Sequence, residues 1–231
     1  MGCLCPVSKF RSSEEEKTLM RAEEQIILPE LSCRSFDREI SRYASGEYIS
    51  HKILKETYEA YSVDIEFFKD KREPSYHYYK ILHANVLGYR VVTLVLIAIW
   101  LSDEDPLEKA SRIFKNYDRK CLNKIGPEGF EIMIEDMIYA TVTFIEFAKK
   151  MEPNKINLLE AYTKRLKNGK EYLKQYLLLL IKQGKDEEET FTEEEFLNAM
   201  KDSFVQKLCS SYGFRELLDC CNSLRVQNGR M

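Results

Sequence analysis

The sequence predicts an all-α fold, and three of its features carry that prediction. Only 9 Gly and 6 Pro occur in 231 residues, too few for the many turns of an all-β protein. Apolar residues make up 44% of the chain, enough for a sizeable buried core. Apolar positions also recur at helical spacing, for example over 53–61 and 130–147. We therefore expect helices joined by short loops.

The first part of the chain indicates two helices and then a loop. Two serines at 12–13 followed by three glutamates are typical of a helix start, and this helix should run to about Ile27. A second helix should begin near Ser35 or Asp37. A Gly-containing loop over 44–50 then leads, through a serine cap, into another helix.

This order of helix, short loop with one central apolar residue, cap and helix recurs three more times. The most apolar segment, 91–101, is too short to span a membrane, which needs about 20 residues, so we expect it to be a buried core helix. Pro106 begins a further helix, and the last loop is strongly acidic. The four loops lie at 44–50, 85–88, 118–126 and 184–195.

The repeated unit is the EF-hand plan, and its motifs resemble those of the neuronal calcium sensor family, which includes recoverin and guanylate-cyclase-activating proteins. The segments that carry the resemblance are Ser45–Ile49, Ala98–Ser102, Leu107–Asp118 and Phe191–Phe196, together with the N-terminal Met-Gly. They resemble the degenerate first hand, the join between the second and third hands, and the exit of the fourth. The resemblance covers roughly 37–212, with a longer stretch over 148–170 than the family pattern.

The resemblance implies the EF-hand superfamily fold, with two pairs of helix–loop–helix units. We expect a lipid-anchor segment and N-terminal helix over 1–34 and a degenerate first pair over 35–105. The second pair, with long helices between its hands and a C-terminal helix, should cover 106–231.

Calcium needs about six to eight oxygen ligands, which an EF-hand loop supplies mainly from its first, third, fifth and seventh positions and from a bidentate Glu at the twelfth. With the central apolar residue setting the register, Arg42 and Ile53 occupy the first and twelfth positions of the first loop. In the second loop these positions fall on His83 and Leu94, with the register open by one residue. Neither loop should bind calcium.

The third loop keeps Asp118 at its first position and Ile125 at its centre. Lys120 at the third position repels a cation, and Gly129 replaces the bidentate Glu. This loop should not bind calcium either.

The fourth loop is therefore the only candidate calcium site. Its possible ligands are Asp186, Glu188, Thr190, Thr192 and Glu195. The first ligand is missing because a glycine stands there, and a glutamate stands where the turn favours glycine. The sequence predicts weak calcium binding here or none; the acidic run is otherwise a solvated face.

The N-terminus indicates lipid attachment. Gly2 is the acceptor for myristoylation once the initiator Met is removed, although Pro6 stands where Ser or Thr is usual. Because myristate alone holds a membrane only weakly, palmitate on Cys3 or Cys5 would supply the second anchor. The alternative is an unmodified tail.

Other chemistry finds little support. A net charge of −3 gives no nucleic-acid footprint. No phosphate-binding loop, hydrolase nucleophile motif or kinase signature occurs, so we expect no enzyme. The three His are not at zinc spacing. Seven Cys without a secretory signal indicate free thiols in a reducing, cytoplasmic compartment, with the protein peripheral to a membrane.

These observations predict a membrane-tethered regulatory protein that binds an amphipathic helix of a cyclase, channel or kinase in a hydrophobic groove, with calcium binding weak or lost. The aromatic residues Phe67, Phe68, Tyr76, Tyr78 and Tyr79 either line that groove or form packed core. The alternatives are a structural EF-hand-like scaffold in a cytoskeletal or ciliary assembly, or a calcium sensor using only the fourth loop.

Overall fold

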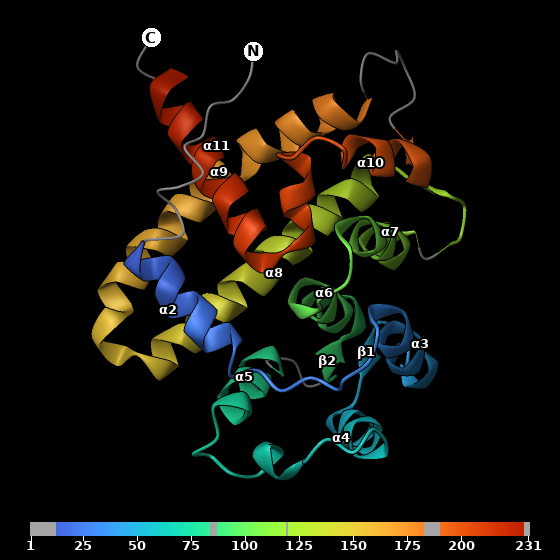
Figure 1. Cartoon of the computed structure of the whole chain (residues 1–231), viewed down its shortest axis with the longest axis vertical. Coiled ribbons are helices and arrows are strands. Elements are labelled where there is room, and N and C mark those ends of the chain that lie inside the picture. Colours follow the sequence, from blue (N-terminus) through green and yellow to red (C-terminus); the bar gives the residue numbers. More distant parts are fainter. Residues whose placement is uncertain (1–12, 84–86, 119, 183–189, 229–231) are drawn as a thin grey trace.

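A computed structural model describes residues 13–83, 87–118, 120–182 and 190–228. Within them the chain forms ten α-helices and four two-residue strands (Figure 1). The predicted all-α class is confirmed. None of the helices in the described ranges combines the length and the apolar character that crossing a membrane requires.

The first pair of helix–strand–helix units comprises α3 (Cys33–Tyr43), β1 (Tyr48–Ile49) and α4 (His51–Ala60), then α5 (Pro74–Leu82), β2 (Tyr89–Arg90) and α6 (Val91–Leu101). A 3₁₀ turn at Glu66–Phe68 leads into α5. The strands β1 and β2 pair antiparallel, with Ile49 opposite Tyr89. The Ser50 hydroxyl accepts from the Ile53 amide and begins α4, as the sequence predicts.

The second pair comprises α7 (Pro106–Tyr117), β3 (Lys124–Ile125) and α8 (Pro127–Met151), then α9 (Ile156–Lys182), β4 (Phe191–Thr192) and α10 (Glu193–Ala199). Here Ile125 lies opposite Phe191, the two residues that set the register of the third and fourth loops. The extra length between these units is almost wholly helical, because α8 and α9 have 25 and 27 residues and a short turn at Pro153–Lys155 joins them.

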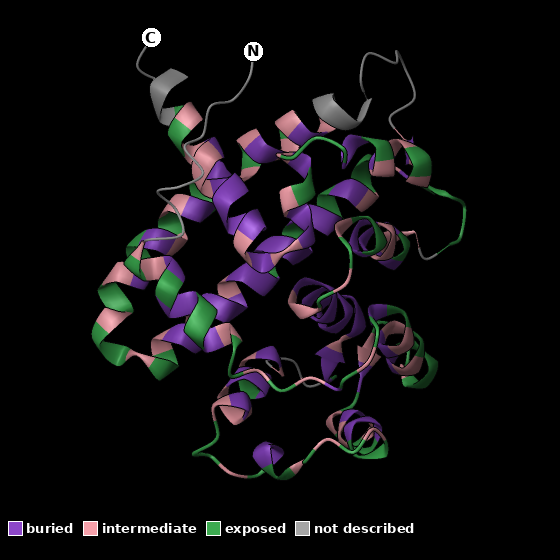
Figure 2. Cartoon of the chain, viewed as in Figure 1, coloured by how far each residue is buried: buried purple, intermediate pink, exposed green. Residues whose placement is uncertain are grey.

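The helix α6 forms the centre of the core. Figure 2 shows it in the colour of buried residues along most of its length, and each residue over 91–100 is buried. It packs against α3, α7 and α8, which cover most of its surface. This confirms the buried core segment expected from the apolar run at 91–101.

The N-terminal helix α2 (Glu14–Glu23) packs against α8 and α9. It ends four residues before the predicted Ile27, because the chain there continues as an irregular linker over 24–32. The next helix also begins earlier than expected, at Cys33, because the Ser32 hydroxyl caps it by accepting from the Ser35 amide.

A buried ion network fixes α2 to the C-terminal helix α11 (Ser211–Asn228), which follows a 3₁₀ turn at Val205–Cys209. The Arg215 guanidinium donates to both carboxylate oxygens of Glu16 at 2.8–3.1 Å and also to Glu23. The Tyr162 hydroxyl of α9 donates to the same Glu16. Burial alone would lower the pKa of Arg215, but Glu23 and Glu16 outweigh it and raise that pKa, so the guanidinium stays charged.

Candidate binding groove

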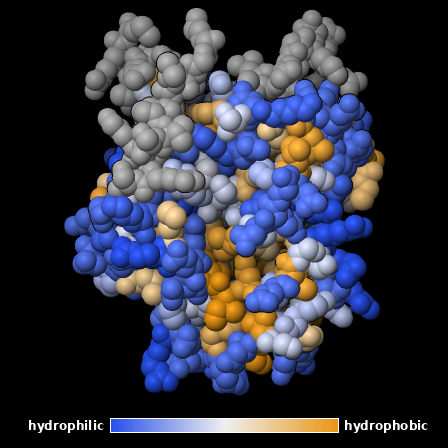
Figure 3. All heavy atoms as spheres, in the orientation of Figure 1, coloured by the Kyte–Doolittle hydropathy of each residue, from blue (hydrophilic) through white to orange (hydrophobic). Residues whose placement is uncertain are grey.

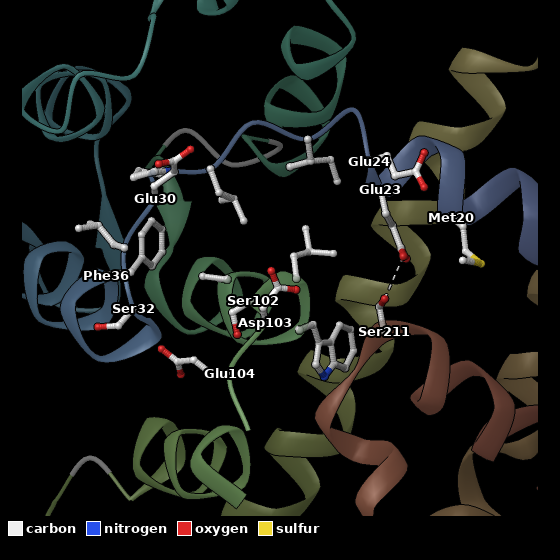
Figure 4. A pocket seen from close by; sticks show the side chains of 17 residues that line it. Met20, Glu23, Glu24, Glu30, Ser32, Phe36, Ser102, Asp103, Glu104 and Ser211 are labelled. Atoms are coloured by element: carbon white, nitrogen blue, oxygen red, sulfur yellow. Dashed lines mark hydrogen bonds between the residues drawn. The ribbon is translucent and has the colours of Figure 1, made fainter. Parts of the chain in front are cut away.

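An open groove of about 950 Å³ lies between α2, the linker 24–32, the start of α3 and the end of α6. Figure 3 shows that the hollowed part of this face is hydrophobic and bordered by hydrophilic side chains. Figure 4 shows the lining from close by, with Glu23 and Met20 on one side and Glu30 and Phe36 on the other. We take this groove as the candidate functional site.

Just over half of the residues that line the groove are apolar. Trp100, the only tryptophan of the sequence, lies in the floor, where its indole N–H donates to the Leu208 carbonyl at 2.9 Å. Its ring packs against Phe214 at 5.5 Å between centroids. The other apolar lining residues are Met20, Ile26, Leu28, Pro29, Leu31, Phe36, Ala98 and Leu101. Met20 is 43% exposed, a large apolar side chain open to solvent at the groove edge.

The linker wall is held in place by α5. The Ser75 hydroxyl accepts from the Ile27 amide at 3.0 Å and donates to the Gln25 carbonyl at 2.7 Å. The Tyr79 hydroxyl donates to the Ile27 carbonyl at 2.8 Å. These three hydrogen bonds pair backbone N–H and C=O groups that the irregular linker cannot pair within itself.

The opposite wall joins α3 to the end of α6. The Glu104 carboxylate accepts from the Cys33 amide at 2.7 Å, and the Cys33 thiol lies 3.2 Å from the Ser102 hydroxyl. Behind this wall the Lys109 ammonium donates to the Ser102 carbonyl. Burial raises the pKa of Cys33 to about 11 and lowers that of Lys109. The Cys33 thiol is thus protonated and unreactive at neutral pH.

The rim of the groove is acidic. Five carboxylates line it, and none of the described lining residues is Lys, Arg or His. Two of the carboxylates are engaged: Glu23 accepts from the Ser211 hydroxyl at 3.0 Å and from Arg215, and Glu104 accepts from the Cys33 amide. The other three, Glu24, Glu30 and Asp103, are exposed.

The aromatic cluster considered as a groove lining lies elsewhere. Phe67, Phe68, Tyr78 and Tyr79 are buried and packed on one another. Phe68 and Tyr79 also line a separate pocket, together with the half-buried Tyr76 and with His51 and His83.

In that separate pocket the structure brings together two histidines that are far apart in sequence. The His51 and His83 rings are 5.7 Å apart, and Nδ1 of His51 lies 2.7 Å from the Tyr89 hydroxyl. Burial, and then the neighbouring His83, lower the pKa of His51. Within the described residues no group of three or more metal-ligating side chains occurs here or elsewhere.

In the third predicted loop, the Asp118 carboxylate accepts hydrogen bonds from the loop's own backbone. One carboxylate oxygen of Asp118 accepts from the Leu122 amide at 3.0 Å and the other from the Asn123 amide at 2.7 Å. Asn123 and Cys121 both have positive φ, a backbone conformation that is energetically unfavourable for most residues other than glycine. Each oxygen of the predicted first-position ligand therefore accepts one hydrogen bond from the loop's own backbone.

The predicted register of the second loop, centred on Arg90 or Val91, is wrong by at least one residue. Because Tyr89 lies opposite Ile49 and is buried, it is the central residue, and the loop shifts one residue toward the N-terminus from Arg90. The first and twelfth positions then fall on Leu82 and Thr93. Neither supplies a carboxylate.

Of the predicted fourth-loop ligands, Asp186 and Glu188 lie outside the described residues. Thr192 and Glu195 form a capping box at the start of α10, in which the Glu195 carboxylate accepts from the Thr192 amide at 2.8 Å. Thr190 precedes β4 and is half-buried. The three lipidation candidates, Gly2, Cys3 and Cys5, also lie outside the described residues.

Sequence reasoning did not find the groove. A signal was present in the apolar run Ile26-Ile27-Leu28 ahead of Pro29, which has neither helical nor strand spacing. In comparisons with known proteins the chain matches no family model, no curated protein and no solved structure. The resemblance to neuronal calcium sensors therefore stays a prediction.

Proposed function

We propose that this chain is a regulatory binding protein on an EF-hand plan, which holds an amphipathic helix of a partner protein in the groove without needing calcium. The observation that carries this proposal is the groove itself, whose lining includes Trp100 and Ala98, with the exposed Met20 at its edge. An apolar groove of this kind suits the apolar face of a helix, with anchors at every third or fourth residue.

The EF-hand plan is supported by the two antiparallel pairs of short strands, each placed between two helices. In a calcium sensor, metal binding opens a helix pair and exposes apolar surface. Here the linker is pinned by Ser75 and Tyr79, and α2 is fixed by Arg215. A groove held in this way presents its apolar surface constantly, so partner binding is set by partner availability rather than by calcium.

The ligand sets support the loss of calcium binding. The first two loops have no carboxylate at their first or twelfth position, and the third has Lys120 at its third position and Gly129 at its twelfth. The fourth loop is where any weak site would lie, with Glu195 as its bidentate ligand. Calorimetry with calcium on the purified chain should give no heat of binding at micromolar metal. Such a heat, lost on Glu195→Gln, would establish the calcium-sensor alternative instead.

A membrane tether completes the proposal. Myristate on Gly2, with palmitate on Cys3 or Cys5, would hold the chain at a membrane. The groove lies near the C-terminal end of α2. The residues that would carry the lipid precede the N-terminal end of that helix in the sequence. Mass spectrometry of the N-terminus from cells should find a myristoyl group. An unmodified N-terminus would remove the tether and leave the groove proposal intact.

Blocking the groove tests its role. Ala98 lines the groove, and Ala98→Phe should fill the floor and abolish binding of an amphipathic helical peptide. Because Ala98 is only 8% exposed, this change can also disturb the core. Met20→Arg alters the exposed edge instead and should weaken binding with no change in thermal stability. Ala60→Phe, on exposed α4, is the matched control. Binding unaffected by both groove variants would overturn the proposal.

A further inference from the structure

The charge of the groove rim narrows the class of partner. Five carboxylates come from three different segments: the end of α2, the linker and the turn after α6. The members of this acidic rim are Glu23, Glu24, Glu30, Asp103 and Glu104. No cation stands among the described residues that line the groove. An isolated acidic cluster is common on protein surfaces, but this one surrounds an apolar floor.

Three members of the rim keep their charge available. Across the described residues, Glu24, Glu30 and Asp103 make no salt bridge, and all three are exposed. Lys109, on α7, interacts electrostatically with Asp103 and Glu104. Its ammonium is buried and donates to the Ser102 carbonyl, so it lies behind the wall rather than in the groove. The groove therefore presents a negative surface to an incoming partner.

The negative surface ends where the groove meets a second, smaller depression of about 400 Å³. The two share Ser32 and Glu104, and the second is lined by Arg34 and Arg112 as well as by acids. Mixed charge there contrasts with the single sign along the groove. We therefore expect the groove, and not the neighbouring depression, to favour a partner of one charge.

We infer that the partner segment is a basic amphipathic helix, with its apolar side on the floor at Trp100 and its Lys or Arg residues against the acidic rim. This inference rests on the proposed function and adds the charge of the partner to it. Complementary charge of this kind speeds association and excludes wrong partners, with a modest gain in affinity for each exposed pair. An acidic helix would meet only repulsion, and so would an anionic membrane surface.

Two synthetic peptides test the inference on the full chain. Each has about 18 residues, roughly 27 Å as a helix, with leucines on one face; one carries lysines on the other face and its counterpart carries glutamates. Trp100 fluorescence reports binding in the groove because it is the chain's only tryptophan, and calorimetry gives the affinity. The lysine peptide should bind at least about 10-fold more tightly, and its affinity should fall with added salt.

A pair of charge reversals supplies the matched control. Glu24→Lys with Glu30→Lys should weaken the lysine peptide by about 10-fold and strengthen the glutamate peptide. Glu56→Lys with Glu59→Lys makes the same change in net charge at two exposed acids of α4, away from the groove, and should alter neither affinity. Circular dichroism checks that each variant is folded.

The outcomes separate the two levels of the proposal. Equal binding of both peptides, or a rim reversal with no effect, would overturn the basic partner while leaving the groove as a binding site. Failure of both peptides to bind would overturn the proposed function itself. Vesicles of phosphatidylcholine and phosphatidylserine should leave Trp100 fluorescence unchanged. A change with vesicles, without peptide binding, would replace the protein partner with a membrane.

Discussion

Replacing Arg215 by methionine tests whether the buried ion network holds α2 in place. The guanidinium and the Glu16 carboxylate are both 0% exposed, and the Glu23 side chain is 10% exposed. Without Arg215, two carboxylates are left in the core with no cation. Breaking a buried pair from one side costs about 3–5 kcal/mol. At roughly 2–4 °C per kcal/mol for a chain of this size, the melting temperature should fall by about 6–20 °C.

Arg165→Met is the matched control for this change. Arg165 also links α9 to α2 and α11, through Glu15 at 3.4 Å and Asp219 at 3.2 Å, but its side chain is 43% exposed. A half-exposed pair should contribute only about 0.2–1 kcal/mol. Thermal and urea unfolding followed by circular dichroism measure both variants. Equal losses, or a loss below about 1 kcal/mol for Arg215→Met, would refute the argument that this network is buried and paired.

Three further predictions concern other parts of the fold. Because burial and His83 hold the pKa of His51 below its ordinary 6.5, the unfolded chain takes up that proton first. Stability should therefore fall as the pH drops below about 6.5, and His51→Gln should flatten the slope in pH-dependent unfolding; an unchanged slope would contradict this. Gly169→Ala would place a Cβ 2.0 Å from the Leu218 carbonyl oxygen between α9 and α11, and chemical unfolding should register a loss of about 1–3 kcal/mol. Asp118→Ala removes two charge-assisted hydrogen bonds from the third loop, and should cost about 1–3 kcal/mol equally in calcium and in chelator; a larger cost in calcium would show that the metal binds there.

Local rules predicted the helices and their caps well. Ser50 and Thr192 begin helices because their hydroxyls accept from amides three residues on, a relation visible in sequence. The apolar residues Ile125 and Phe191 were chosen as equivalent loop centres, and the structure sets them opposite each other. Both relations depend on short spacing or on repeated order.

The groove was not predictable in this way because distant residues create it. Its linker wall depends on a hydrogen bond from Ile27 to Ser75, and α2 depends on Glu16 meeting Arg215, 199 residues further along the chain. No short-range sequence pattern predicts contacts between residues so far apart in the chain. The aromatic cluster around Tyr79 left both interpretations open for the same reason: its composition suits a groove or a core, and only its contacts with other elements show that it is buried.

The affinity of the lysine peptide in excess calcium and in excess chelator tests the central claim most directly. The walls of the groove are fixed by hydrogen bonds and a buried ion network that lie outside the four predicted calcium loops. Calorimetry and Trp100 fluorescence should therefore give the same dissociation constant in both conditions. Binding that appears only with calcium would contradict the account, because the groove would then need a metal-driven opening.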